Sequence, residues 1–243
     1  MRVSIITVTF NCVKTLQRTI ESVLEQNVSG LEYILVDGCS TDGTLELIKS
    51  YKEQYPDTIS YISEKDYGLY DAMNKGIQMA SGDLIGIING DDYYTKNAIN
   101  EAVQLAVSTG VDIVYSDLLY CRLNEIDYAH PLKANHQRLV ERMSVNHPTC
   151  FVKKTVYEKY GVFDTRFKIA ADYDLMARFY KNGCHFEKAS IVLAVMEYGG
   201  VSSNNKKSIN EKYEIHRKYF YRLSSEIYRI RNICLFYFRK IRK

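Results

Sequence analysis

The chain has 243 residues, of which 46% are hydrophobic and 25% charged, a composition that excludes disordered and collagen-like proteins. This length suffices for one large domain with a buried core. No apolar run reaches the roughly 18 residues of a membrane-spanning helix, and the apolar start lacks the cleavage site of a signal peptide. The six cysteines form no CxxC pair, so we expect reduced thiols in a cytoplasmic protein.

Charge is distributed unevenly along the chain. Residues 206–243 contain 12 Lys or Arg and 3 Asp or Glu, whereas residues 1–205 contain 20 and 26. An enzyme that acts on nucleic acid needs positive charge around its cleft. An acidic body with a basic tail therefore argues against nucleic acid as a partner.

Two hydrophobic periods alternate along the first half of the chain. Runs of β-branched and apolar residues predict buried strands, whereas apolar residues at three- and four-residue spacing predict helices. The expected strands cover residues 3–9, 31–36, 59–62, 84–88 and 111–115, and the expected helices cover 13–24, 45–51, 69–80 and 99–106. This alternation predicts βαβ units and a Rossmann-like, mainly parallel sheet flanked by helices.

The second half of the chain is less regular. It predicts a hairpin of strands 118–123 and 126–130, a strand at 191–196, and helices at 137–143, 155–160, 172–182 and 208–243. We therefore divide the chain into an α/β half at residues 1–116, a smaller region at 117–205 and a C-terminal helical segment at 206–243.

Polar residues follow the ends of the expected strands in the first half. They include Thr9, Asn11, Asp37, Asp66, Asp91 and Asp92. Ligands bind open α/β sheets where the carboxyl ends of the parallel strands emerge. Since a core does not need carboxylates at one edge of its sheet, these residues predict a binding site.

Two of these positions have more than one interpretation. The adjacent carboxylates of Asp91 and Asp92 repel each other unless a cation compensates, which favours a divalent metal bound by carboxylate and phosphate oxygens. Asn-Gly-Asp-Asp is also good turn chemistry. The carboxylate of Asp37 can accept N–H groups of a nucleotide base, or it can simply close the following turn.

Two common nucleotide-binding motifs are absent. There is no GxGxxG after the first strand and no GxxxxGK[ST] anywhere in the sequence. These absences exclude nicotinamide dehydrogenases of the Rossmann type and P-loop kinases and ATPases.

Four sequence blocks, in order along residues 3–92, resemble the first half of a family 2 glycosyltransferase. They are SIITVTFN at 4–11, VDGCSTDGT at 36–44, SEKDYGLYDAMNKG at 63–76 and NGDD at 89–92. Gly161-x-Phe163-Asp164 and Ala171-Asp172-Tyr173-Asp174 resemble the acceptor half of this family less strictly. The likeness covers about residues 1–200.

This resemblance implies a GT-A fold and transfer of a sugar from a nucleotide diphosphate donor, with UDP favoured. Residues 1–116 would bind the nucleotide sugar, and residues 117–205 would bind the acceptor and hold the catalytic base. The implied donor-site roles are base binding by Asp37 with Thr9 and Asn11 against it, Asp66 and Asn74 near the nucleotide, Asp91 at the ribose or sugar, and Mn²⁺ or Mg²⁺ on Asp92.

Asp172 matches the position of the catalytic base in inverting members of the family. An inverting displacement needs a carboxylate that takes the proton from the acceptor hydroxyl. Many members have Glu-Asp where this chain has Ala171-Asp172, and Asp172 could instead cap the following helix. Asp174 is a rival that faces another direction along a helix. His147 is a weaker candidate for contacting the metal or the diphosphate.

The chain has no tryptophan, so it lacks the Gln-x-x-Arg-Trp motif of processive synthases in the family. The expected reaction is therefore the addition of one sugar to a saccharide acceptor, which we expect in lipid-linked form, during surface polysaccharide synthesis. A sugar nucleotidyltransferase would need a Gly-rich, Arg-containing loop after the first strand, which is absent. The alternative is a non-catalytic member that binds nucleotide sugar or recruits partners to a membrane.

The C-terminal segment mixes aromatic, aliphatic and basic residues. This composition favours a helix in the membrane interface with its cations on anionic headgroups, and hence a peripheral protein on the inner face of the cell membrane. The alternative is a terminal helix that docks on the acidic body or forms a contact between subunits.

Overall fold

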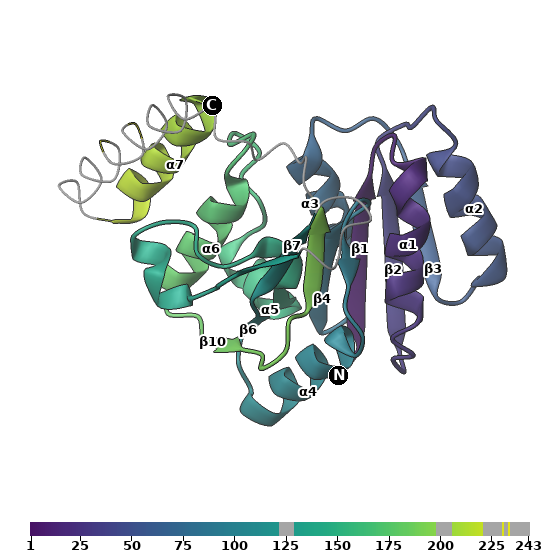
Figure 1. Cartoon of the computed structure of the whole chain (residues 1–243), viewed down its shortest axis with the longest axis horizontal. Coiled ribbons are helices and arrows are strands. Elements are labelled where there is room, and N and C mark those ends of the chain that lie inside the picture. The colour runs from purple at the N-terminus through teal and green to yellow at the C-terminus, as the bar shows by residue number, and fades with distance from the viewer. Residues whose placement is uncertain (122–128, 198–205, 221–229, 231–232, 234–243) are drawn as a thin grey trace.

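The computed structural model describes residues 1–121, 129–197, 206–220, 230 and 233. The expected α/β architecture is confirmed, with helices on both faces of a central sheet (Figure 1). The strand order in this sheet is β10-β6-β9-β4-β1-β2-β3. These strands are β1 (Val3–Thr9), β2 (Leu31–Asp37), β3 (Ile59–Ser63), β4 (Leu84–Asn89), β6 (Ile113–Tyr115), β9 (Phe151–Lys153) and β10 (Phe186–Lys188).

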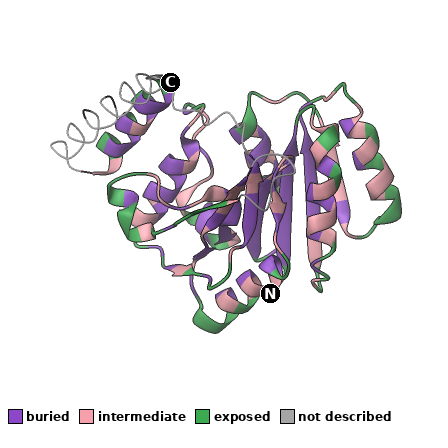
Figure 2. Ribbon diagram, in the orientation of Figure 1, coloured by how far each residue is buried: buried purple, intermediate pink, exposed green. Residues whose placement is uncertain are grey.

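Apolar side chains of the central strands point to both faces of the sheet. In β1, Val3 and Ile5 belong to one hydrophobic cluster and Ile6 and Val8 to another. The first cluster includes residues of α1 (Val13–Leu24), α2 (Thr44–Gln54) and α4 (Ala98–Thr109), and the second includes residues of α3 (Leu69–Met79), α5 (Lys154–Tyr160) and α6 (Ala171–Lys181). The strands are therefore buried along most of their length (Figure 2).

The order of the strands places a topological switch point beside β1. The chain builds β1, β2 and β3 towards one side, and then returns to place β4 on the other side of β1. All pairs among these four strands are parallel. The crevice at the carboxyl ends of β1 and β4 is where open α/β sheets bind ligands.

A smaller sheet has the order β5-β11-β7-β8. It consists of β5 (Tyr93–Tyr94), β7 (Leu118–Cys121), β8 (His130–Leu132) and β11 (Ala194–Glu197). The expected hairpin is present as the antiparallel pair of β7 and β8, with Tyr120 opposite His130, whereas residues 122–128 between them lie outside the described part.

Several expectations for the second half need correction. The helix expected at 137–143 is a short 3-10 helix, His136–Val140, and the strand expected at 191–196 begins only at Ala194. The short strands β5, β9 and β10 were not predicted. Strand β9 runs antiparallel to both of its neighbours, β4 and β6. Strands of two or three residues are too short to show a hydrophobic period. The division of the chain at residues 116 and 205 stays a prediction.

Helix α7 (Lys206–Tyr219) docks against α6 (Figure 1). Its buried residues include Ile209, Tyr213, Ile215 and His216. For this part of the tail the docking alternative is confirmed. Most of the remainder of the helix expected at 208–243 lies outside the described residues. No helix of the described residues has both the length and the apolar character needed to cross a membrane.

Candidate active site at the carboxyl edge of the sheet

The parallel register brings the polar strand ends together. Thr9 lies opposite Asp37 in the pair of β1 and β2, Asp37 lies opposite Ser63 in the pair of β2 and β3, and Val8 lies opposite Asn89 in the pair of β1 and β4. Because all four strands end at the same edge, the loops that follow them lie together at the switch point of the sheet.

Asp37 lies fully buried at the centre of this edge. Its Oδ2 accepts hydrogen bonds from the Ser63 hydroxyl at 2.6 Å and from the Ser40 N–H at 3.1 Å, and its Oδ1 accepts a longer one from the Thr9 hydroxyl at 3.3 Å. The hydrogen bond from Ser40 confirms that Asp37 closes the turn that follows β2. Since each carboxylate oxygen offers two acceptor sites, Oδ1 has one acceptor site that these bonds do not use.

The loops after β1 and β2 are tied to each other. Asn11 has a positive φ of 50°, its Oδ1 accepts the Thr41 N–H at 2.8 Å, and its own N–H donates to Ser40 Oγ at 2.9 Å. Phe10, beside it, exposes 66% of its surface. These bonds hold the backbone of both loops fixed at the mouth of the crevice.

Asp66 lies against the backbone of Gly38, the residue that follows Asp37. A Cβ added at Gly38 would lie 2.6 Å from Asp66 Oδ2 and 3.3 Å from the ring of Phe10. Only glycine permits this approach. Asp66 Oδ1 also accepts the N–H of Gly68 at 2.9 Å. The structure thus brings Thr9, Asn11, Asp37 and Asp66 together.

Asn74, on α3, makes a different kind of contact. Its Nδ2 donates to the carbonyl of Phe163 and its Oδ1 accepts the N–H of Phe163, both at 2.9 Å. This reciprocal pair joins α3 to the second half of the chain. The expected role of Asn74 near the nucleotide stays a prediction.

Asp91 and Asp92 follow β4 on the other side of the crevice. Asp92 is 1% exposed, and its Oδ1 and Oδ2 accept hydrogen bonds from the Glu197 N–H at 3.2 Å and from Asn89 Nδ2 at 3.1 Å. Burial, followed by the charge of Asp91, raises the pKa of Asp92 well above its ordinary value. Burial, followed by the charge of Glu197 and against the influence of Arg18, raises the pKa of Asp91.

Arg18 and Glu197 complete this acidic cluster, and sequence reasoning missed both. Arg18 pairs with Glu197 Oε1 at 2.5 Å and donates to the carbonyl of Asp91 at 3.1 Å, with its guanidinium 4.3 Å from the ring centre of Tyr93. The two residues are 179 positions apart in the chain, and no spacing signal connects them.

The residues after β4 suit a divalent cation that is also bound by a ligand. No group of three or more His, Cys, Asp or Glu side chains of the described part could hold a metal by itself. Two adjacent carboxylates with raised pKa values, however, favour a nearby positive charge. Asn89 Oδ1 is also buried without a hydrogen-bond partner in the described structure. Mg²⁺-type sites commonly use one or two carboxylates and complete the shell with phosphate oxygens.

Asp172 is the second residue of α6, so the interpretation of Asp172 as an N-cap is wrong, because the N-cap is Ala170. Its Oδ1 accepts the Tyr173 N–H at 2.8 Å and, at 3.4 Å, the hydroxyl of Tyr70. Burial raises the pKa of Asp172, against the effects of these two bonds and of the charge of Lys212. A partly buried carboxylate of raised pKa suits a general base.

Asp174, the rival candidate for the base, makes structural contacts with its carboxylate. It is fully buried, and its carboxylate contacts Lys218 Nζ at 2.7 Å, the Tyr219 hydroxyl at 3.0 Å and Arg178 at 3.2 Å. His147 packs edge-on against Phe163, with ring centres 5.5 Å apart, and burial lowers its pKa to about 4. It is therefore neutral at physiological pH.

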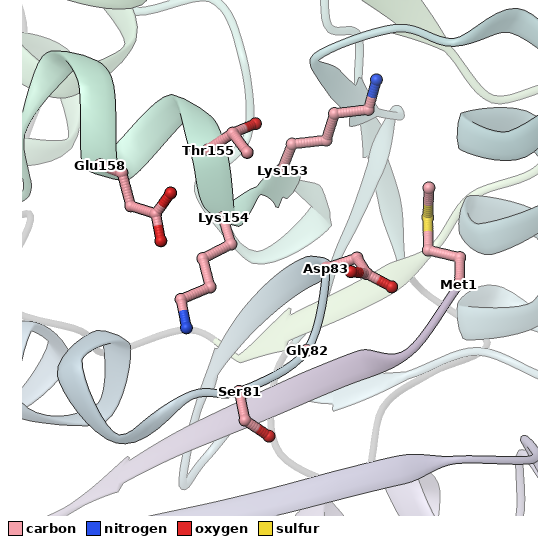
Figure 3. A pocket seen from close by; sticks show the side chains of 8 residues that line it. All are labelled: Met1, Ser81, Gly82, Asp83, Lys153, Lys154, Thr155 and Glu158. Atoms are coloured by element: carbon pink, nitrogen blue, oxygen red, sulfur yellow. The ribbon is translucent and has the colours of Figure 1, made fainter.

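A hollow of about 290 Å³ lies at the opposite edge of the sheet (Figure 3). Its lining includes Met1, which precedes β1, and Gly82 and Asp83, which precede β4, together with Lys153 and Lys154. Met1, Gly82 and Asp83 mark the amino ends of β1 and β4, and Lys153 ends the antiparallel β9, so the hollow is separate from the carboxyl-edge site.

We expect Asp92→Asn to stabilise the metal-free protein, because the wild-type carboxyl has a raised pKa in the folded state. Deprotonation of such a group lowers the free energy of unfolding as pH rises through its raised pKa. The stability that Asp92→Asn gains over the wild type should therefore vanish as pH falls below that pKa. The new amide can also donate to Asn89 Oδ1 once the Asn89 side chain turns over. Urea unfolding of both proteins in EDTA over a pH series measures this difference.

The control for this experiment is Asp57→Asn, which changes an exposed carboxylate. Its effect on the free energy of unfolding should stay small at every pH. An Asp92→Asn effect that does not change with pH would contradict the assignment of a raised pKa to Asp92.

Comparisons with known proteins agree with this architecture. The PGL/p-HBAD biosynthesis glycosyltransferase of Mycobacterium bovis (strain BCG / Pasteur 1173P2) is 26% identical over 204 residues, which cover 82% of this chain and 78% of that protein. An uncharacterized glycosyltransferase of Mycobacterium tuberculosis (strain ATCC 25618 / H37Rv) is 44% identical over 84 residues, 34% of this chain and 31% of that protein.

Two solved structures share the fold. S. aureus TarS 1-349 in complex with UDP-GlcNAc has a TM-score of 0.71 at 19% identity, over 88% of this chain and 64% of that one. The mannosyltransferase PcManGT from Pyrobaculum calidifontis, in complex with GDP-Man and Mn²⁺, has a TM-score of 0.71 at 20% identity, over 89% and 63%. The chain thus spans less than two thirds of these solved chains, and the shared fold is GT-A.

The family model for glycosyl transferase family 2 matches residues 4–242, nearly the whole chain. Together with the carboxyl-edge site, this match establishes that the chain belongs to glycosyl transferase family 2.

Proposed function

We propose that the chain is a metal-dependent, inverting, non-processive glycosyltransferase. It transfers one sugar from a nucleotide diphosphate donor, with a UDP-sugar favoured, to a saccharide acceptor, in lipid-linked form, during synthesis of a surface polysaccharide. The observation that carries this proposal is the pair of adjacent carboxylates after β4, half-buried Asp91 and buried Asp92, at the switch point of the sheet.

Asp92, with Asp91 beside it, would hold Mn²⁺ or Mg²⁺ together with the diphosphate of the donor. The cation, when bound, neutralises negative charge on the departing nucleoside diphosphate. The anionic donor and the two carboxylates repel each other without it, so donor and metal should bind together. The complex of PcManGT with GDP-Man and Mn²⁺ supports this expectation by likeness of fold.

The nucleotide base lies, in this proposal, beside Asp37. The buried Asp37 is fixed by three donors and keeps acceptor capacity on Oδ1. Thr9, Asn11 and Asp66 shape the surrounding loops, and Asp91 contacts the ribose or the sugar. TarS in complex with UDP-GlcNAc supports a UDP-sugar, again by likeness of fold.

Asp172 acts as the general base. The acceptor hydroxyl oxygen attacks the anomeric carbon, its proton passes to Asp172, and the bond from that carbon to the phosphate oxygen breaks. The nucleoside diphosphate leaves with that electron pair. Because the hydroxyl attacks the face opposite the leaving group, the anomeric configuration inverts. The Tyr70 hydroxyl and the Tyr173 N–H hold Asp172 Oδ1, which leaves Oδ2 for the acceptor.

The donor site is tested by thermal unfolding with UDP, GDP and dTDP, with and without Mn²⁺. At a concentration about 100-fold above Kd, the preferred nucleotide with Mn²⁺ should raise Tm by about 5 to 10 °C. Asp92→Ala should remove the part of the shift that needs Mn²⁺. A shift that is equal in wild type and Asp92→Ala would contradict the metal role of Asp92.

The base is tested by Asp172→Asn. The variant should fold, bind nucleotide as the wild type does, and lose transfer by about 100-fold or more, because the amide cannot take a proton. Asp57→Asn serves as a control for the loss of one carboxylate. Near-native turnover of Asp172→Asn would reject the base assignment, and nucleotide binding by a wild type that transfers nothing would favour the non-catalytic alternative.

We also propose that the segment after α7 binds the membrane surface. Residues 220–243 contain seven Lys or Arg and one Glu. Ile230 and Ile233, which the structure describes, expose 62% and 37% of their surface. Exposed apolar side chains among cations suit an interface with anionic lipid, where a lipid-linked acceptor would be reached.

Flotation with anionic liposomes tests this attachment. The full chain should float with the vesicles, and a chain without residues 225–243 should stay at the bottom of the gradient, because it loses most of these cations. Neutral vesicles are the control. Equal flotation of the two chains would reject the membrane role of the segment.

A further inference from the structure

Glu211 of α7 makes an unusual set of contacts at the start of α6. Its Oε2 accepts the N–H groups of Ile169 at 2.8 Å and Ala170 at 3.0 Å, and its Oε1 accepts the N–H of Lys168 at 3.1 Å. The residue is only 8% exposed. One buried carboxylate therefore binds three consecutive backbone amides of a loop that lies more than forty positions earlier in the chain.

The three amides belong to the loop before α6 and to its N-cap, Ala170. A backbone N–H that is removed from water without an acceptor costs free energy, so these groups need one. A negative charge beside the amino end of α6 is also favourable to the helix dipole. Glu211 thus supplies, from another helix, the acceptor for the amides that lead into α6.

The loop that Glu211 holds leads directly to Asp172. The carbonyl of Ala170 accepts the first N–H bonds of α6, from Tyr173 at 3.0 Å and from Asp174 at 3.2 Å. The Tyr70 hydroxyl lies near the Ile169 carbonyl at 3.0 Å and Asp172 Oδ1 at 3.4 Å. The same peptide units thus contact Glu211 on their N–H side and set the position of Asp172.

Helix α7 is itself fixed on both sides of this contact. The His216 ring nitrogen Nε2 lies 2.8 Å from the carbonyl of Val140, and Lys218 and Tyr219 contact the buried Asp174. Ile209 and Ile215 are buried against the body. Because α7 cannot slide without breaking these contacts, the place of Glu211 is defined.

We infer that Glu211 is a positioning residue for the reaction: by binding the amides of Lys168, Ile169 and Ala170, it fixes the backbone turn that aims the carboxylate of Asp172 at the acceptor. This inference rests on the proposed function, in which Asp172 is the base. Glu211 itself touches neither donor nor acceptor. The C-terminal helix is then part of the catalytic apparatus, although no motif of the sequence marks it.

The test compares Glu211→Ala and Glu211→Gln with Glu214→Gln, which removes the same charge from an exposed position on the same helix. Transfer is measured with the nucleotide sugar that the wild type uses best among UDP-, GDP- and dTDP-sugars. Because a misplaced base slows the chemical step, Glu211→Ala should lower kcat about 10- to 100-fold. Glu211→Gln, which keeps one acceptor oxygen, should lower kcat less, and Glu214→Gln should match the wild type.

Two further measurements separate positioning from general damage to the fold. The donor KM and the thermal shift by nucleotide should stay within about twofold of the wild type, because only the step after binding is affected. The pKa of Asp172, followed by NMR of the carboxyl carbon, should fall in Glu211→Ala, since burial is what raises it and a loosened turn admits water, which favours the ionised form.

The outcomes keep this inference and the proposed function apart. If Asp172→Asn abolishes transfer while folded Glu211→Ala keeps the kcat and the Asp172 pKa of the wild type, the inference on Glu211 is wrong and the proposed function stands. If Asp172→Asn retains transfer, the base assignment fails and the inference fails with it. If Glu211→Ala does not fold, the same criteria apply to Glu211→Gln.

Discussion

Burial of carboxylates against backbone amides is the interaction on which the functional edge depends. Asp37 accepts an N–H of the turn that follows it, Asp92 accepts the N–H of Glu197, and Glu211 accepts three successive N–H groups before α6. A buried ion is costly unless such donors compensate it. Each of these bonds therefore fixes a loop as well as a charge, and the last two join segments that are distant in the chain.

The two halves of the molecule meet at Phe163. Asn74 of α3 binds both polar groups of its backbone, the ring of Tyr70 stacks on it at 5.3 Å, and His147 packs against it. The side that carries the loops after β1 and β2 and the side that carries Asp172 are thus joined by apolar packing together with paired hydrogen bonds. Such a junction resists relative movement more than either kind of contact would alone.

The sequence predicted the part of the fold that depends on local pattern. The strands β1 to β4 and the helices α1 and α3 have strong hydrophobic periods, and their ends fall within about two residues of the expected positions. The polar strand ends, from Thr9 to Asp92, could be placed at one edge because parallel strands share a direction. Strands β9 and β10 were missed because three residues carry no period.

What the sequence could not predict consists of contacts over long separations. Nothing in the spacing of Arg18, Glu197 or Glu211 indicates that they would reach Asp91, Asp92 and the start of α6. This chain has Ala171 where many family members have a Glu before the aspartate, and the structure supplies a carboxylate to this turn from α7. A residue missing from a local motif can therefore have a counterpart elsewhere in the fold.

The docking of α7 also bears on where the working unit of this protein ends. A boundary drawn at residue 205, where the composition changes, would leave the amides of residues 168–170 without their acceptor and Asp174 without Lys218 and Tyr219. The smallest piece that keeps the turn before Asp172 intact extends through Tyr219. The tail thus divides at Tyr219 into α7, which packs on the body of the protein, and the residues that follow it.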